Sequence, residues 1–276
     1  MRPPDHAAVD TQGRSMNPAT AASYLAVTEQ PGQPASRIQL EMLEARYAWA
    51  ASQACGKDVL EVGCGAGMGL PGLADVARLV QAGDVDRENL RAARAACASH
   101  TNVAVRAFHA GDLPFPSESF DLVLLFEAIY YVPDVRRFFE EAKRVLRPGG
   151  KLLIVTVNPQ WTGFNPSPLR TRYWSSADLL AALRHAGFIA RVQGAFRETS
   201  GGMASAIRMI RRVAVALDLV PRTMQGKARL KRIFYGRLLA VPPVLGDKGR
   251  SPRLEAIGTA GTRYHRVLYA TAQRAS

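Results

Sequence analysis

The chain has 276 residues, of which 47% are hydrophobic and 21% are charged, so it can bury the core of one large domain. It has no run of about eighteen apolar residues, and the pattern therefore predicts no membrane span. Residues 1–15 lack the apolar centre of a secretory signal. The cysteines, Cys55, Cys64 and Cys97, lack metal-site spacing and cannot all pair, which favours a cytoplasmic protein without a bound metal.

The net charge of +13 is concentrated in one segment. Residues 197–253 contain 13 basic and 3 acidic side chains, which gives 13 − 3 = +10. The rest of the chain contains 23 basic and 20 acidic residues, a balance of only +3. Any argument for an anionic partner therefore concerns this segment.

The predicted elements alternate between helices and strands from residue 37 onward. Residues 1–36 show no sustained period and are predicted to be a flexible segment, in which Tyr24 and the turn at 31–32 could close over a site. Apolar spacing predicts helices at 37–54, 87–98, 135–146 and 176–186, with Asp86, Asp134 and either Ser175 or Ser176 before the last three. Strands are predicted at 58–62, 77–85, 103–108, 120–126, 151–157, 188–192 and 264–272.

This alternation is typical of an α/β protein with a doubly wound, mostly parallel sheet covered on both faces. We expect residues 37–196 and 258–276 to form that domain. Residues 197–257 are expected to form a basic helical cap inserted before the last strand. Arg147-Pro-Gly-Gly150 is expected to turn the chain sharply into the fifth strand.

A ligand site is indicated where the first predicted strand ends. Glu61 and Val62 lead directly into a glycine-rich run, Gly63-Cys-Gly-Ala-Gly67, and then into a helix. Glycines allow a tight turn and close approach of a ligand to the backbone, at the sheet edge where doubly wound folds bind ligands. Asp84 ends the next strand, where a carboxylate can accept hydrogen bonds from ribose hydroxyls. The alternative is an ordinary tight turn with a structural aspartate.

The string Gly67-x-Gly69-x-x-Gly72 formally matches the dinucleotide-binding pattern. It begins five residues after the strand, inside the predicted helix, where it cannot form the phosphate-binding turn. A nicotinamide cofactor is therefore disfavoured.

Three segments carry a resemblance to the class I S-adenosylmethionine-dependent methyltransferases, strongest for the small-molecule branch. In order, they are Val59-Leu-Glu-Val-Gly-Cys-Gly-Ala-Gly67, Leu113-Pro-Phe-Pro-Ser-Glu-Ser-Phe-Asp-Leu-Val123 and Arg144-Val-Leu-Arg-Pro-Gly-Gly-Lys-Leu152. The resemblance covers roughly residues 37–192. It implies a seven-stranded Rossmann-like sheet with an antiparallel last strand, S-adenosylmethionine as cofactor and S-adenosylhomocysteine as product.

The resemblance also implies roles for individual residues. The cofactor's methionine part would be surrounded by Glu61, Gly63, Cys64, Gly65 and Gly67, its ribose held by Asp84 and its adenine packed on Val85. The family's usual acid near the adenine amine is replaced by His109, followed by Ala110, so Asp112 or the backbone is expected to serve instead. Phe126 and Glu127, at the end of the fourth strand, would face the methyl donor.

The methyl acceptor is expected near Glu127, Tyr130, Tyr131 and Asn158, although the two tyrosines could instead pack under the next helix. A sulfonium donor is already activated, so alignment and water exclusion matter more than a catalytic triad or metal. The loop 158–174 is rich in aromatic and proline residues, as is typical of a wall around a small organic molecule. The sequence thus favours O- or N-methylation of a small molecule, such as a natural product or a sugar-containing compound.

Two alternatives use the basic segment. It could contact phosphates of a nucleic acid, but Phe126-Glu-Ala-Ile129 lacks the Asn/Asp-Pro-Pro-aromatic run of base-amine methylating enzymes. Residues 207–219 and 227–239 both have the pattern of a basic amphipathic helix, which could lie on a membrane and present a lipid-linked acceptor. Alternatively, the protein binds the cofactor without catalysis and docks to a partner through this segment.

Overall fold

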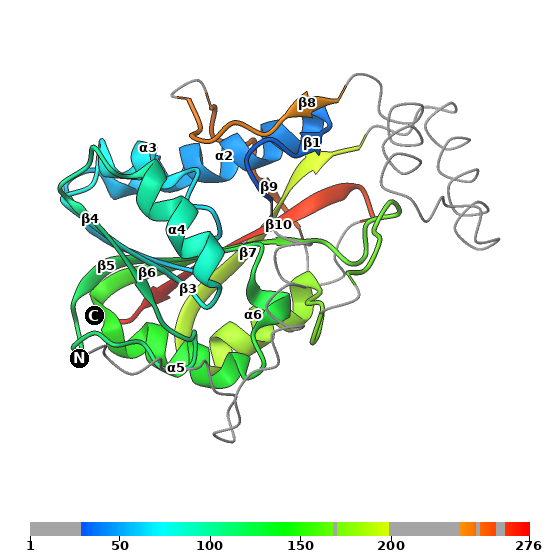
Figure 1. Cartoon of the computed structure of the whole chain (residues 1–276). Coiled ribbons are helices and arrows are strands. Elements are labelled where there is room, and N and C mark those ends of the chain that lie inside the picture. Colours follow the sequence, from blue (N-terminus) through cyan, green and yellow to red (C-terminus); the bar gives the residue numbers. More distant parts are fainter. Residues whose placement is uncertain (1–28, 168–169, 199–237, 247–248, 258–262) are drawn as a thin grey trace.

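The computed structural model describes residues 29–167, 170–198, 238–246, 249–257 and 263–276. Its centre is an eight-stranded sheet in the order β4-β3-β2-β5-β6-β10-β7-β9 (Figure 1). β2, β3, β4, β5 and β6 are mutually parallel, whereas β10 runs antiparallel to both β6 and β7. The strands are β2 (Asp58–Val62), β3 (Leu79–Asp84), β4 (Val103–Ala107), β5 (Phe120–Phe126), β6 (Leu146–Val157), β7 (Phe188–Arg197), β9 (Glu255–Ala256) and β10 (His265–Arg274).

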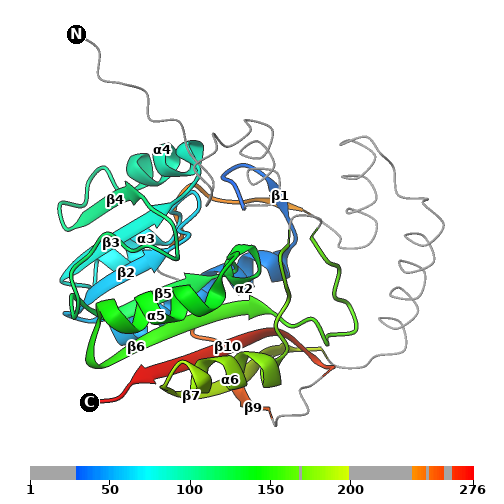
Figure 2. The same ribbon diagram turned by 90° about the horizontal axis from the view of Figure 1, so that it is seen from below.

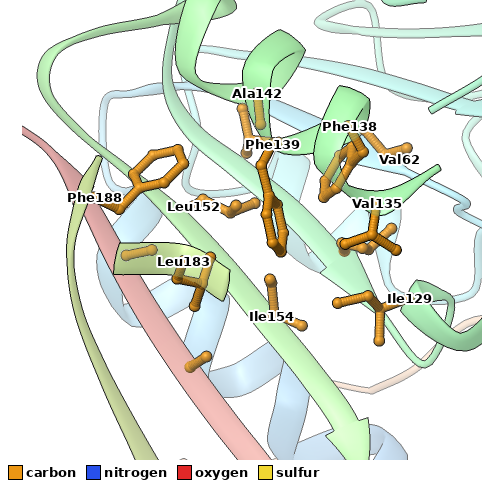
Figure 3. Close-up of a cluster of buried hydrophobic side chains, with 14 of the residues drawn as sticks. Val62, Ile129, Val135, Phe138, Phe139, Ala142, Leu152, Ile154, Leu183 and Phe188 are labelled. Carbon is orange, nitrogen blue, oxygen red and sulfur yellow. The ribbon is translucent and has the colours of Figure 1, made fainter. Parts of the chain in front are cut away.

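Helices cover both faces of this sheet, as expected for a doubly wound fold. α2 (Arg37–Ala54), α3 (Leu70–Ala74) and α4 (Arg87–Ala96) cover one face, and α5 (Val135–Val145) and α6 (Ser176–His185) cover the other (Figures 1 and 2). Under α5 and α6 the core contains Phe138, Phe139, Ile154 and Leu183, all completely or almost completely buried (Figure 3). β5 is buried on both faces, which explains why its sequence is mostly apolar rather than alternating, and β2 is fully buried even though it carries Asp58 and Glu61.

Several predicted helix starts are confirmed by their caps. The Asp86 side chain accepts hydrogen bonds from the backbone N–H groups of Glu88 and Asn89 at the start of α4. Asp134 caps α5 by accepting from Arg137 N, and Ser175 caps α6 by accepting from Asp178 N. These short polar side chains satisfy N–H groups that have no partner within the helix.

Two predictions about strands are wrong. Arg147-Pro-Gly-Gly150 does not turn the chain before the fifth strand: β6 already begins at Leu146, which pairs with Phe120. The next paired residues are Leu122 and Lys151, so the register shifts by several residues on the β6 side. Residues 147–150 therefore bulge out of the ladder, and Gly149 adopts a φ of +75°. The sheet also has eight strands instead of seven, since the two-residue β9 pairs antiparallel with β7.

A second, two-stranded sheet joins distant parts of the chain. β1 (Pro34–Ala35) pairs antiparallel with β8 (Leu239–Ala240), and Gly32 N donates to Val241 O at 2.8 Å. We call residues 29–36 the strap. Its partner segment, 238–246, reaches the glycine-rich region, where Leu245 N donates to Met68 O at 2.9 Å.

Most of the predicted basic cap lies outside the described residues, as does Tyr24. Its described parts contain the short strands β8 and β9. None of the helices in the described ranges is long and apolar enough to cross a membrane.

Candidate cofactor and acceptor site

The glycine-rich loop after β2 is a turn that only glycine fits comfortably. Gly63, Gly65 and Gly67 have φ values of +70°, +55° and +71°, in the left-handed region that side chains disfavour. A Cβ on Gly67 would lie 2.6 Å from the Cβ of Ala93, so the loop packs directly on α4. Gly63 N donates to Gly83 O at 2.8 Å, which ties the loop to the end of β3. The spacing of these glycines therefore reflects backbone geometry at the carboxyl edge of the sheet.

Asp84 at the end of β3 is held rigidly against this loop. Its Oδ2 accepts from Gly65 N at 2.9 Å, while Oδ1 accepts from Asp86 N at 2.9 Å and from Asn89 Nδ2 at 3.3 Å. Burial raises the pKa of Asp84 above its usual range, although these N–H donors oppose the shift. A carboxylate has about four lone-pair positions, so at least one direction remains for a ligand hydroxyl.

The residues expected near an adenine lie beyond the ends of β3 and β4. Val85 is 43% exposed, which leaves its side chain free to pack on a ligand. Phe108 packs beneath Gly83, and the turn that follows carries His109 and Asp112, which are joined by a backbone bridge. Ala110 between them is half-buried against the core.

Glu61, the last acidic residue of β2, is a buried carboxylate with an incomplete set of partners. It is 1% exposed, and its Oε1 accepts from the Tyr47 hydroxyl at 2.8 Å. Its Oε2 is buried without a hydrogen-bond partner. Burial raises the pKa of Glu61 to about 7, against the opposing effects of the Tyr47 hydrogen bond and the Arg46 charge. A buried oxygen of this kind is costly unless a ligand supplies a donor.

Arg46 of α2 is the buried cation of the site. Its guanidinium pairs with the carboxylate of Glu29 in the strap, but its Nε has no partner. Its positive charge also lowers the pKa values of Glu61 and Glu127, against the effect of burial. One arginine thus faces three carboxylates, and the surplus of negative charge suits a cationic ligand.

Glu127 and Tyr130 lie together where β5 ends. Glu127 has φ +50°, its N–H donates to Val155 O at 2.7 Å, and its Oε2 accepts from the Tyr130 hydroxyl at 3.0 Å. Burial raises the pKa of Glu127 to about 7, opposed by the charge of Arg46. Tyr130 follows within the short 3-10 helix η1 (Ile129–Tyr131).

Aromatic rings continue from Tyr130 into the loop 158–174. The Tyr130 ring centroid lies 4.5 Å from that of Tyr131 and 5.1 Å from that of Tyr173, which in turn lies 4.6 Å from Phe164. Thr171 N donates to Tyr130 O at 2.8 Å and holds the loop against η1. We call these four rings the aromatic cluster.

Known proteins resemble this chain in sequence and in fold. Residues 60–154 match the family described as a methyltransferase domain. A probable S-adenosylmethionine-dependent methyltransferase of Mycolicibacterium smegmatis is 36% identical over 164 residues, which cover 57% of this chain and 62% of that protein. A demethylmenaquinone methyltransferase of Tropheryma whipplei is 36% identical over 99 residues, covering 36% and 41% respectively. The chain thus spans about half the length of the curated relatives it matches.

The crystal structure of the YcgJ protein from Bacillus subtilis superposes with a TM-score of 0.54 at 16% identity, over 87% of this chain and 100% of that one. This structural likeness concerns the fold alone. The family match in sequence, however, includes the glycine-rich loop. Residues 60–154 therefore form a methyltransferase domain, similar in sequence to S-adenosylmethionine-dependent methyltransferases.

The methyltransferase domain has groups that fit the two charges of the cofactor's amino-acid part. The free Oε2 of Glu61 can accept from an ammonium, and the free Nε of Arg46 can donate to a carboxylate. Both atoms are buried without partners and lie at the same sheet edge as the glycine-rich loop. S-adenosylmethionine therefore fits the residues present.

Some residues expected to bind the cofactor or the acceptor have side chains that make other contacts. The Cys64 side chain is buried in the core, and its Sγ donates to Gly65 O at 3.7 Å, within the loop itself. The Phe126 ring packs edge-on against Tyr47 with a centroid distance of 5.6 Å. The Asn158 amide accepts from Gln160 N and donates to His265 O, which fixes the end of β6.

Among the described residues no group of three His, Cys, Asp or Glu side chains could hold a metal ion.

The sequence interpretation missed Arg46, Tyr47, Asn89 and Glu29. A signal for Arg46 was present, because it lies four residues after Met42 and three before Trp49 on the otherwise apolar stripe of α2. A charged residue on such a stripe needs a partner. For Glu29 no local pattern exists, since its contact depends on the strap.

Proposed function

We propose that this protein transfers a methyl group from S-adenosylmethionine to an oxygen or nitrogen atom of a small molecule by direct in-line displacement. The observation that carries the proposal is the pair of unpartnered buried groups, Glu61 Oε2 and Arg46 Nε, beside the glycine-rich loop. The acceptor would approach from the aromatic cluster, whose rings suit an organic molecule better than a polymer backbone.

The chain's contribution would be mainly alignment. When bound, the sulfonium cofactor supplies an electrophilic methyl group. Glu61 and Arg46 would orient its amino-acid part, and Asp84 would hold its ribose. Glu127 and Tyr130 would face the acceptor and keep bulk water from its reacting atom. Positioning of this kind can contribute about 7–11 kcal/mol at best.

The printed name of one relative, demethylmenaquinone methyltransferase, agrees with a small acceptor. A nucleic-acid or lipid-linked acceptor remains the second proposal, because residues 197–253 carry a charge of +10. A cytoplasmic location stays a prediction from the cysteine content.

The test is radiolabelled methyl transfer from S-adenosylmethionine into a cell extract, separated into small molecules, lipid, RNA and protein. Calorimetry of cofactor binding to the same preparation is the companion measurement. Label in the small-molecule fraction supports the proposal. Label in RNA or lipid would favour the basic segment as the acceptor surface. Cofactor binding without label in any fraction would indicate a binding protein, and no binding would contradict the proposal.

A further inference from the structure

Glu127 occupies a backbone conformation that its side chain does not favour. Its φ of +50° is left-handed, and residues other than glycine adopt this conformation rarely, often at functional sites. Three hydrogen bonds support it: its own N–H donates to Val155 O, and its carboxylate accepts from the Tyr130 hydroxyl and from the backbone of Val157. The carboxylate is thereby fixed where β5 ends and the aromatic cluster begins.

The charged and titratable groups around Glu127 come from four elements. Among the described groups that influence Glu127, Arg46 of α2 is the single cation and lowers its pKa. Glu29 of the strap is an anion and raises it. Tyr130 of η1 and Tyr269 of β10 are phenols, both with pKa values raised by burial, so they stay neutral. In these surroundings burial raises the pKa of Glu127 to about 7. A general base works best when its pKa lies near the working pH.

Among hydroxyl acceptors, this base strength favours those that give up their proton most easily. A phenol with a pKa of about 10, like tyrosine, transfers its proton to such a carboxylate at a disadvantage of roughly a thousandfold. An alkyl hydroxyl about as weakly acidic as water, with a pKa of about 15.7, is disfavoured by roughly another factor of a million. Tyr130, which donates to the same carboxylate, packs against the rings of Tyr131 and Tyr173, so flat apolar faces lie close by.

We propose that the acceptor is a hydroxyl group on an aromatic ring, with Glu127 as its general base and Tyr130 as a positioning residue. This inference rests on the proposed function. The hydroxyl proton moves to Glu127 as the acceptor oxygen uses a lone pair to bond the methyl carbon. The bond from that carbon to sulfur breaks and leaves its electron pair on the now neutral sulfur. Glu127 then releases its proton to water.

Two probes separate this role from a structural one. At about pH 8, 4-methylphenol is protonated, like tyrosine with its pKa of about 10, whereas 4-nitrophenol is mostly ionised and needs no base. Glu127→Gln should slow transfer to 4-methylphenol by about 10²–10⁴-fold, the usual worth of a general base, and leave transfer to 4-nitrophenol within about tenfold. Glu127→Asp should recover part of the rate with 4-methylphenol. Glu140→Gln is the control, because Glu140 is exposed on α5 and pairs with Arg136.

Equal losses with both phenols, or an Asp variant no better than Gln, would overturn the role of Glu127. Transfer by the wild type to alkyl alcohols or amines but to neither phenol would overturn the acceptor class and leave the proposed function intact. Calorimetry of cofactor binding separates failure of this inference from failure of the proposed function. Absence of binding in the wild type rejects the proposed function itself. The Gln variant should retain this binding, which shows that it is folded.

Discussion

The cofactor half and the acceptor half of the site are built in different ways. In the cofactor half, Asp84 and the glycine-rich loop are held by backbone N–H groups within about twenty-five residues of sequence. In the acceptor half, Glu127 is held by a tyrosine hydroxyl and influenced by charges from α2 and the strap. The ribose side of the first half is a rigid local motif, whereas its Glu61–Arg46 pair and the whole second half depend on side chains that distant elements bring together. Substitutions should therefore affect stability and cofactor affinity in the first half, and rate and pH dependence in the second.

The largest effect is expected for Gly67→Ala. The added Cβ would lie 2.6 Å from Ala93 Cβ at φ +71°. The left-handed conformation costs about 1–2 kcal/mol and overpacking about 1–3 kcal/mol, so the free energy of unfolding should fall by about 2–5 kcal/mol. Denaturant unfolding measures this change. Gly72→Ala is the matched control, since a Cβ added there would meet nothing within 4 Å, and a loss equal to that of Gly67 would contradict the expectation.

Next in size is the pH dependence of stability without cofactor. The pKa of Glu61 rises from the usual 4.5 to about 7 in the folded state, so the folded protein binds this proton more tightly. The corresponding stabilisation is fully present below about pH 4.5 and is lost as pH rises through about 7; it amounts to about 3 kcal/mol. Glu61→Gln should reduce the change in unfolding free energy between about pH 5 and 8, and the part that remains comes from Glu127, whose pKa is also about 7. An unchanged slope would place the titrating group elsewhere.

Asp84→Ala should weaken cofactor binding by about 1–3 kcal/mol, the cost of a lost buried hydrogen-bond partner. The same substitution leaves Gly65 N and Asp86 N without their acceptor, so the melting temperature should fall with the affinity. Calorimetry and thermal unfolding measure the two effects. Asp75→Ala, at an exposed carboxylate, serves as the control. Unaltered affinity would refute the placement of the ribose.

The smallest effect is expected in the acceptor half, from Tyr130→Phe. The Tyr130 hydrogen bond lowers the pKa of Glu127, so its loss should raise that pKa further. Because the base must be ionised, the acidic limb of the pH–rate profile should move to higher pH, while cofactor affinity stays the same. If the acidic limb of the pH–rate profile does not move, or if cofactor affinity falls as well, the proposed distinction between the cofactor half and the acceptor half is wrong.

The same division explains what the sequence could predict. The glycine spacing, Asp84 and the caps Asp86 and Asp134 depend on neighbours in the chain, so their patterns are visible without a structure. Glu127 could be placed at the end of β5, but not its pairing with Tyr130 or its exposure to the charge of Arg46. The start of β6 was mispredicted because Pro-Gly-Gly is typical of a turn, whereas Leu146 already pairs with Phe120 of β5 and the next four residues form a bulge. The strap's pairing with β8 leaves no periodic signal at all.

That pairing has a consequence for how the protein is made. Pro34 lies opposite Ala240, and the small apolar cluster beneath includes Ala66 and Met68 of the glycine-rich region together with Val241 and Leu245. At a synthesis rate of about 5–20 residues per second, a nascent chain waits roughly 10–40 s between the first strand of this pair and the second. During that interval the outer side of the glycine-rich region lacks the cover that Val241 and Leu245 provide. The glycine-rich region is therefore covered only late in synthesis, after residues 241–245 have left the ribosome.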